Sequence, residues 1–280
     1  MWSTIAQSDA AECGDRGLEM KRNLIIMLAA AALLNTGNSQ PRAAEVKLLG
    51  AVGVRQIMLD LGPAFERASG HKLVSAFDST GIIVRRLTAG EEFDLIMINR
   101  TGIDSVAKSG KVIVGSTADI AKSVAAAAVR QGVPKPDIST VESFKRALLS
   151  AKSIARPSPA VGGSSGDHIV KVLARLGIAD EVNAKSLINE HPEDMSAAPG
   201  YMVANGRADL ALHQLQELMA VPGIEIVGPF PGELQGEFMF SVAFTTGTKQ
   251  EEAGRKLIEF LRTPEAIAVI RTKGMEPAAR

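Results

Sequence analysis

Short apolar runs alternate with amphipathic segments between residues 46 and 99, and this alternation limits the folds open to the chain more than any other feature. The apolar runs, each of the length of a buried strand, are 46–52, 72–78 and 94–99. Apolar residues at helical spacing fill residues 55–69, where Gly62 and Pro63 predict an early interruption, and residues 81–90. A strand–helix–strand–helix–strand order requires right-handed crossovers, so the sequence predicts a largely parallel sheet.

The same alternation continues through the middle of the chain. Residues 125–130 and 153–155 have the composition of strands. Ser139 and Glu142 have the spacing of a capping box, which predicts that a helix begins there. Further strands are predicted at 184–188, 208–213 and 224–230.

The C-terminal part returns to the first group of elements. Residues 237–246 form the one long strand that the sequence predicts, and it could carry the chain back to the beginning of the fold. Thr263 followed by Pro264 is a strong helix start. We therefore expect an α/β fold of two lobes with a ligand cleft between them. The predicted bounds are 45–123 with 240–280 for lobe 1, and 124–239 for lobe 2.

The N-terminal residues have the pattern of a secretory signal peptide. Two basic residues follow Met20, and small and polar residues follow the apolar run 24–34. This run is shorter than the roughly 20 residues of a membrane span, which disfavours the alternative of a membrane anchor. We expect residues 1–44 to comprise an extension and a signal peptide, with Met20 as the true start and cleavage after Ser39 or Ala44. The mature chain is then expected in the periplasm.

Composition excludes several classes of function. The 31 basic and 31 acidic residues leave no basic surface that would indicate nucleic acid binding. The only cysteine, Cys13, precedes the signal peptide, so the mature chain has no disulfide and no cysteine for a lipid anchor. The four histidines lack the spacing of a metal site. We expect no metal, no cofactor, no membrane insertion after cleavage, and a monomer.

Residues 162–166, GGSSG, match the G-x-S-x-G pattern of serine hydrolases. That motif needs a strand that runs directly into the serine. Pro157 and Pro159 place it in a loop instead, which excludes a nucleophile at Ser164. The segment also lacks the Gly-Lys-Ser/Thr ending of a phosphate loop. As a glycine-rich helix start, Ser164 and Ser165 remain candidates for binding an anion through backbone N–H groups.

Residues 77–87, FDSTGIIVRRL, begin a helix with small hydroxyl residues. A predicted strand ends at Asp78, and Ser79, Thr80 and Gly81 follow. Unpaired N–H groups and the positive end of the helix dipole favour an anion at such a position. An ordinary N-cap is the alternative for one of the hydroxyls, and both roles can hold together.

Four segments resemble, in their order, the periplasmic substrate-binding proteins of ABC importers, in particular the molybdate-binding-protein-like branch of the type II class. They are KLLGAVGVRQIMLDLGPAFERASGHKL, FDSTGIIVRRLTAGEEFDLIMIN, VANGRADLALHQLQEL and TKGMEPAA. The resemblance extends from about residue 45 to the C-terminus. It implies the periplasmic-binding-protein type II fold, a small anionic ligand held near Ser79 and Thr80, and an ABC importer permease as a partner.

The loop after the first strand departs from the molybdate-binding proteins. Those proteins typically have a serine there, whereas this chain has Gly53, Val54 and Arg55. A cation is mildly unfavourable in the first turn of a helix, so an anionic ligand at Arg55 would explain its position. A solvated surface arginine is the alternative. Because guanidinium pairs with carboxylate through two hydrogen bonds, this site fits an organic carboxylate better than molybdate.

Two histidines are further candidates. His213 stands where the molybdate-binding proteins commonly have an aromatic residue near the ligand, and Gln214 follows it. His168 lies in the first turn of a predicted helix, where neutral imidazole is favoured, although Asp167 beside it acts in the opposite direction. A packed or solvent-exposed side chain is the alternative for each histidine.

Two functions remain open at this point. The first is a periplasmic solute-binding protein that captures a small anion, an organic polycarboxylate or otherwise a molybdate-like oxyanion, for an ABC importer. The second follows because Arg55, ADLALHQLQEL and PGIEIVGPFPGELQ also resemble the aconitate isomerase relatives of that family. This resemblance implies a cofactor-free proton shift between the cis and trans isomers. Helix N-termini and Arg55 would hold the carboxylates, and His213, or else His168, would remove and return the proton.

Overall fold

The computed structural model describes residues 43–160, 163–190 and 194–279. The predicted signal peptide, with Met20, Cys13 and the cleavage site after Ser39, lies outside these ranges. No helix within them combines the length and apolarity needed to cross a membrane.

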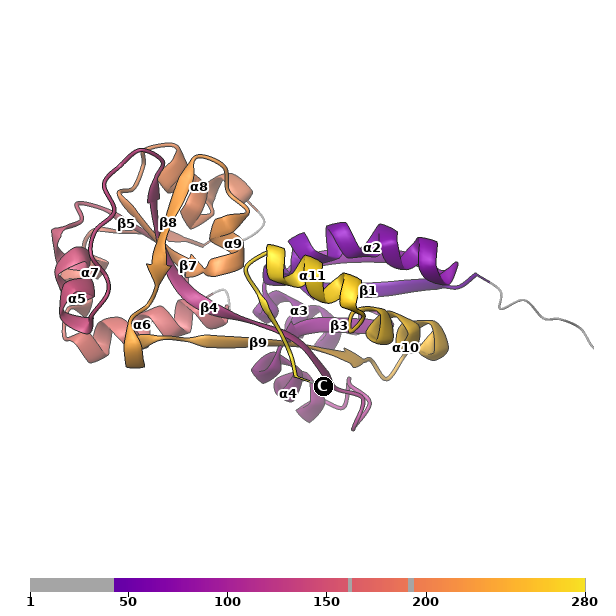
Figure 1. The fold of residues 1–280 in the computed structure, drawn as a ribbon. Coiled ribbons are helices and arrows are strands. Elements are labelled where there is room, and N and C mark those ends of the chain that lie inside the picture. Colours follow the sequence, from indigo (N-terminus) through magenta and orange to yellow (C-terminus); the bar gives the residue numbers. More distant parts are fainter. Residues whose placement is uncertain (1–42, 161–162, 191–193, 280) are drawn as a thin grey trace, which may run out of the picture. The chain divides into compact units, whose positions relative to one another are not determined.

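The N-terminal part forms a first strand group with helices on both faces. Its parallel strands are β1 (Glu45–Ala51), β2 (Lys72–Asp78) and β3 (Leu95–Asn99), in the order β2-β1-β3. The connecting elements are η1 (Val52–Val54), α2 (Arg55–Ser69), α3 (Thr80–Thr88) and α4 (Arg100–Lys108). In Figure 1, α2 lies above β1 and β3, and α4 lies below them. All five residues of β3 are buried, as expected for a strand covered on both faces.

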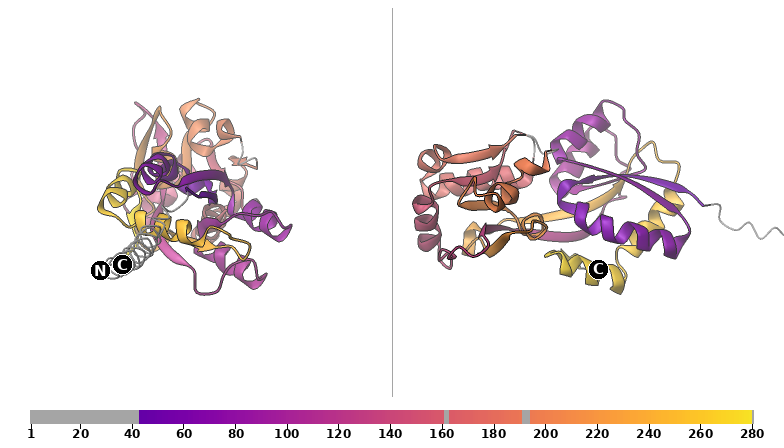
Figure 2. Two further views of the ribbon diagram at one scale, coloured as in Figure 1. Left: turned by 90° about the vertical axis from the view of Figure 1, so that its right-hand side faces the viewer. Right: turned by 90° about the horizontal axis from the view of Figure 1, so that it is seen from above.

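Two long antiparallel strands continue the sheet beyond β3. β9 (Glu237–Phe244) pairs with β3, and β4 (Ala118–Arg130) pairs with β9. Figure 1 and the right-hand view of Figure 2 both show β4 and β9 side by side. We expected 237–246 to be the one long strand, which was wrong, because β4 is longer, with 13 residues. The parallel pairing predicted from residues 46–99 is confirmed for β1, β2 and β3, whereas β4 pairs antiparallel with each of its partners.

The end of β4 belongs to a second strand group. Residues 125–130 of β4 pair with β7 (Leu210–Gln214) and β8 (Ile224–Pro229). On the far side of β7, β5 (Ile154–Pro157) pairs with β7 and with β6 (Ser186–Asn189). The helices here are α5 (Val141–Ser150), α6 (Ser164–Leu176), α7 (Ala179–Asn183), α8 (Pro199–Ala204) and α9 (Leu215–Met219), with η2 (Met195–Ala197) and η3 (Gly232–Leu234). The four alanines 125–128 of β4 are buried, which lets α8 and α9 pack closely against the strand.

The C-terminal elements return to the first strand group. They are α10 (Glu251–Phe260), α11 (Pro264–Thr272) and β10 (Glu276–Pro277), which pairs with β4. The predicted helix start at Thr263 is confirmed, because its hydroxyl accepts a hydrogen bond from the N–H of Ala266 and Pro264 follows it. Helices α10 and α11 contact α2, so the two ends of the described chain share one core.

Two local predictions need correction. Helix α2 continues through Gly62 and Pro63 to Ser69, because its apolar face is buried and Pro63 removes only one backbone donor. The capping box lies one residue later than expected. Thr140, not Ser139, caps α5, and Ser143 takes the reciprocal position that the sequence analysis gave to Glu142.

Candidate functional site

A cavity of about 130 Å³ lies where the first strand group meets the second. Gly53, Arg55 and Ser79 line it from the first group, and Ser164 and His213 line it from the second. About 10–15 Å³ of such volume is the minimum for a single water molecule, so this cavity is well above that limit. Its volume suits a small organic acid or an oxyanion.

Within the described ranges, six helix starts converge on this cavity. The lining includes the N-cap residues of η1, α3, α4, α6, α8 and α9, which are Ala51, Ser79, Asn99, Gly163, Ala198 and Gln214. The first N–H groups of a helix have no partner within the helix, and the helix dipole places partial positive charge there. A cavity lined by several such starts is electrostatically suited to an anion.

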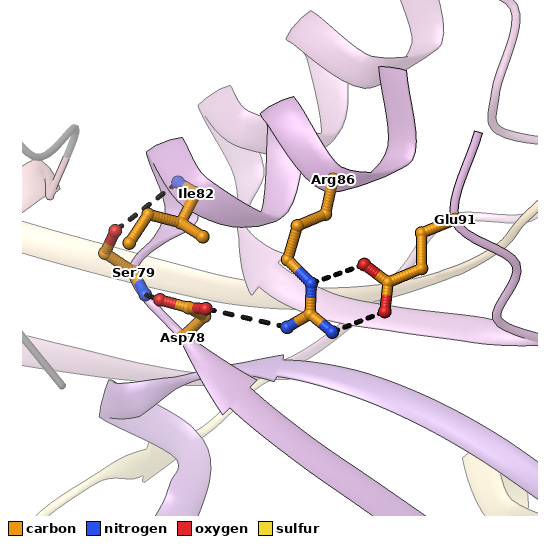
Figure 3. Close-up of polar contacts among 5 residues, drawn as sticks. All are labelled: Asp78, Ser79, Ile82, Arg86 and Glu91. Atoms are coloured by element: carbon orange, nitrogen blue, oxygen red, sulfur yellow. Dashed lines mark hydrogen bonds and ion pairs between the residues drawn. The ribbon is translucent and has the colours of Figure 1, made fainter. Parts of the chain in front are cut away.

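The start of α3 combines an N-cap with a fixed ion-pair network, which Figure 3 shows. Ser79 accepts a hydrogen bond from the N–H of Ile82 (3.4 Å), and Asp78 accepts one from the N–H of Ser79 (2.9 Å). Arg86 lies 3.5 Å from Asp78 and pairs through two nitrogens with Glu91. Arg86 therefore offsets the negative charge of Asp78 beside the cavity, and its hydrogen bonds lower the pKa of Glu91.

Thr80 is buried between two helix starts. Its methyl group lies so close to Gly102 of α4 that a Cβ there would come within 2.4 Å of it. Asn99 caps α4 by accepting a hydrogen bond from the N–H of Gly102 at 2.7 Å. The starts of α3 and α4 are thus packed tightly against each other, and both line the cavity.

Among the described residues of the cavity lining, Arg55 is the only Lys or Arg. It is half-buried at the first position of α2, and within the described ranges it has no ion pair or side-chain hydrogen bond. The dipole of α2 disfavours a cation at this position. A ligand carboxylate would supply the missing partner.

His213 and Glu217 form a pair on the opposite wall. His213 Nδ1 lies 3.4 Å from Glu217 Oε1, and the two side chains are only 12% and 21% exposed. Burial lowers the pKa of His213 to about 4 and raises the pKa of Glu217 to about 8. Both groups are therefore mainly uncharged at neutral pH, so Glu217 does not strongly repel an anion.

The imidazole of His213 is held in one tautomer. Its Nδ1 accepts a hydrogen bond of 2.8 Å from the backbone N–H of Gln214, so the proton of the neutral ring resides on Nε2. Nε2 makes no hydrogen bond with any described residue. His213 can thus donate a hydrogen bond to a ligand from Nε2 while its Nδ1 is occupied.

The structure brings most of the predicted ligand-binding residues to one place. Of the candidates, those in the cavity lining are Gly53, Arg55, Ser79, Thr80, Ser164, Ser165, His213 and Gln214. Val54 is instead fully buried in the apolar core, and Gly81 lies one residue beyond the lining. β5 ends at Pro157 and α6 begins at Ser164, and the described residues between them, 158–160 and 163, belong to no helix or strand.

His168 lies outside the cavity lining. Its ring stacks at 6.2 Å on Phe230 and meets Phe238 edge-on at 5.7 Å, and Nε2 is 3.0 Å from the carbonyl oxygen of Leu234. Burial lowers its pKa. These contacts give His168 a packing role in the second strand group.

Sequence reasoning missed several residues of the cavity. Glu217 is the most consequential, and Asn99, Tyr201 and Gln216 also line the cavity. Glu217 lies four residues after His213, a spacing that places two side chains on one helical face, but a strand ends between them. In the three described ranges, no group of three or more His, Cys, Asp or Glu residues is arranged to hold a metal ion.

The family model described as bacterial extracellular solute-binding protein matches residues 46–276. An aconitate isomerase from a Pseudomonas species is 34% identical over 259 residues, which cover 90% of this chain and 94% of the relative. The molybdate-binding protein ModA of Azotobacter vinelandii is 28% identical over 245 residues, covering 83% and 90% of the two chains. The solved structure of the periplasmic molybdate-binding protein of Azotobacter vinelandii has a TM-score of 0.66 at 19% identity and covers 84% of this chain and 99% of that one. The predicted two-lobed periplasmic-binding-protein fold is thereby confirmed.

Proposed function

The chain belongs to the bacterial extracellular solute-binding protein family, and from this premise we propose that its cavity binds a small organic polycarboxylate and shifts a proton within it, as an aconitate isomerase does. The observation that carries the proposal is the pair formed by His213 and Glu217, two groups of opposite pKa shift, in a cavity otherwise built for an anion. Environments that move two pKa values in opposite directions are typical of acid–base sites.

The cavity offers complementary contacts for more than one carboxylate. Arg55 can pair with one carboxylate through two hydrogen bonds. The helix starts at Ser79 and Ser164 face the cavity from the two strand groups and can hold others through backbone N–H groups and hydroxyls. An elongated acid with several carboxylates would use these contacts together, whereas a compact oxyanion would reach only some of them.

The contacts of His213 favour a role other than the base expected from the sequence. Its Nδ1 already accepts a hydrogen bond, and its pKa of about 4 makes the ring a weak base. We propose that the Nε2–H group of His213 donates to a ligand carboxylate and stabilises charge that develops on it. Glu217, whose pKa is about 8, is suited to carry the proton, because acid–base catalysis is most effective near the working pH.

The proposed step moves one proton and needs no cofactor. The carboxylate form of Glu217 takes a proton from the methylene carbon of the substrate, and the C–H electron pair forms a double bond to the central carbon. The electrons of the original double bond move toward the neighbouring carbon and its carboxylate, giving a dienolate held by Arg55 and His213. Glu217 then returns the proton to that carbon, so the double bond has shifted and its geometry can change between trans and cis.

Proton NMR of trans-aconitate incubated with the purified chain tests the proposal. We expect resonances of the cis isomer to grow with time. Glu217→Gln should reduce the rate at least about 100-fold, since general acid–base catalysis contributes roughly 10²–10⁴-fold.

Glu233→Gln is the matched control, because Glu233 is 64% exposed and pairs with Arg175 on the surface. It should leave the rate unchanged. Absence of conversion by the unaltered chain would exclude the isomerase function.

A receptor for an ABC importer is the second candidate. The family match and the similarity to a molybdate-binding protein favour it, as do the hydroxyls of Ser79 and Thr80 at the start of α3. In this function the same cavity would hold the anion and release it to a permease, in the periplasm. Tight binding of trans-aconitate or molybdate by calorimetry, without turnover, would support the receptor.

The signal peptide and the division into two lobes are proposed for both candidate functions. We propose that residues 1–44 include the signal peptide and that the two lobes comprise 45–123 with 240–280, and 124–239. The cavity would then lie in the cleft between the lobes, where ligands bind in open α/β folds.

A further inference from the structure

Gln216 is buried in the wall of the cavity, with 3% of its surface exposed. It is the second residue of α9, in the second strand group. Its side chain nevertheless reaches the first strand group, because Nε2 donates a hydrogen bond to the carbonyl oxygen of Gly53 at 3.2 Å.

The contacts of Gln216 fix which way its amide faces. The carbonyl oxygen of Gly53 can only accept, so the nitrogen of Gln216 must lie against it. The second N–H of this nitrogen donates to Oε1 of Gln214 at 3.1 Å, and Oε1 of Gln216 accepts from the hydroxyl of Ser123. All hydrogen-bonding groups of this amide are thereby used.

The orientation of Gln214 follows from that of Gln216. Since Oε1 of Gln214 accepts from Gln216, only its amide nitrogen is left for a ligand. Gln214 is 5% exposed and lines the cavity, and its nitrogen has no hydrogen-bond partner in the described part of the chain.

Gly53 leaves the space that this arrangement needs. A Cβ at residue 53 would lie 2.6 Å from the ring of Phe240 and 3.0 Å from Nε2 of Gln216. A side chain there would displace the amide from the carbonyl. The carbonyl of Gly53 would then present an unpaired acceptor beside the cavity, which an anion would avoid.

We propose that Gln216 is a positioning residue that makes the cavity selective for anions: it turns the amide nitrogen of Gln214 toward the ligand and covers the carbonyl of Gly53. This proposal deepens the proposed function, because it rests on an anion as the ligand. It does not depend on whether the anion is converted.

The test is calorimetric titration of the full chain with trans-aconitate and with molybdate. Gln216→Glu has almost the same shape but replaces the donor nitrogen by an oxygen, and it should weaken binding of whichever anion the unaltered chain binds by at least about tenfold. Gln131→Glu makes the same change of charge in an exposed turn and should have no effect.

A double-variant cycle separates positioning from a general loss of structure. Gln216→Met should weaken binding more than Gln214→Met, because it also uncovers the carbonyl of Gly53, and the double variant should bind no more weakly than Gln216→Met alone. If conversion occurs, the loss should appear in KM and only weakly in kcat. If Gln216→Glu does not fold, Gln214→Met alone must still weaken binding, and an unchanged affinity overturns the proposal.

The outcomes distinguish this proposal from the proposed function. Binding of trans-aconitate that Gln216→Glu leaves unchanged would overturn the role of Gln216 alone. Binding of molybdate only, weakened by Gln216→Glu, would support the role of Gln216 and overturn the polycarboxylate function. A chain that bound neither anion would overturn both.

Discussion

At the scale of single residues, the site depends on two groups that burial keeps uncharged. His213 in the folded chain has a pKa near 4 instead of 6.5, and Glu217 has a pKa near 8 instead of 4.5. The lowered pKa of His213 makes folding more favourable as pH rises from 4 to 6.5. The raised pKa of Glu217 makes folding less favourable as pH rises from 4.5 to 8. The two effects oppose each other up to pH 6.5, and above it only the effect of Glu217 remains.

Glu217→Gln should therefore change how stability depends on pH. Between pH 6.5 and 8, Glu217 is ionised in the unfolded chain but largely protonated in the folded chain. The free energy of unfolding therefore falls by about 2 kcal/mol over this range. The variant should lack this loss, as measured by urea denaturation at both pH values. Parallel curves for the variant and the unaltered chain would contradict the buried, protonated state of Glu217.

Arg55→Ala should remove the main contact with a ligand carboxylate. A charged hydrogen-bonded contact contributes about 1.5–3 kcal/mol, so affinity for trans-aconitate should fall roughly 10- to 100-fold by calorimetry. Binding of molybdate should hardly change. Arg85→Ala, at an exposed position of α3, is the matched control. Undiminished affinity for the carboxylate would remove Arg55 from the site.

The sequence revealed some of these residues and concealed others. Ser79 and Arg55 stand out locally, because a hydroxyl at a helix start and a cation in a first turn have direct physical meanings. Glu217 does not, since an acidic residue in a short helix is ordinary until its burial is known. The contacts of Gln216 join residues 53, 123 and 214 and depend on the assembled fold.

At the scale of the elements, local signals were reliable for where elements lie and less so for how they pair. The strands β1, β2 and β3 and the cap at Thr263 agree with the sequence pattern. The antiparallel pairing of β4 could not be predicted, because its partners β7, β8 and β9 lie far along the chain. The position of the α5 cap was missed by one residue, since Ser139 and Thr140 are both good caps.

The α5 cap gives a prediction at this scale. Thr140→Ala removes the hydroxyl that accepts from the N–H of Ser143 and should lower the free energy of unfolding by about 1 kcal/mol. Ser139→Ala is the matched control and should have little effect, because Ser139 is exposed and its hydrogen bonds go to Asp137, which is also exposed, and not to the first turn of α5. Urea denaturation of both variants measures the difference. A larger decrease in the free energy of unfolding for Ser139→Ala would show that Ser139 is the N-cap of α5.

At the scale of the whole molecule, the cavity exists because distant segments meet. Residues near 53, 79, 164 and 213 lie at the ends of strands or the starts of helices, and all of them line the cavity. The positive potential of the cavity is therefore the sum of contributions from several helix starts. A ligand that touches all of them couples the two strand groups. Such a ligand should raise the melting temperature as well as fill the cavity.

The return of β9 to β3 also governs the order in which the chain can fold. Until residues 237–244 have been synthesised, β3 has an open edge, and α10 and α11 are not yet present to cover α2. An incomplete chain therefore cannot close its first strand group, and pairing between such distant segments is slow. For a protein exported as we propose, this dependence would keep the first strand group incomplete until the last segment of the chain is available.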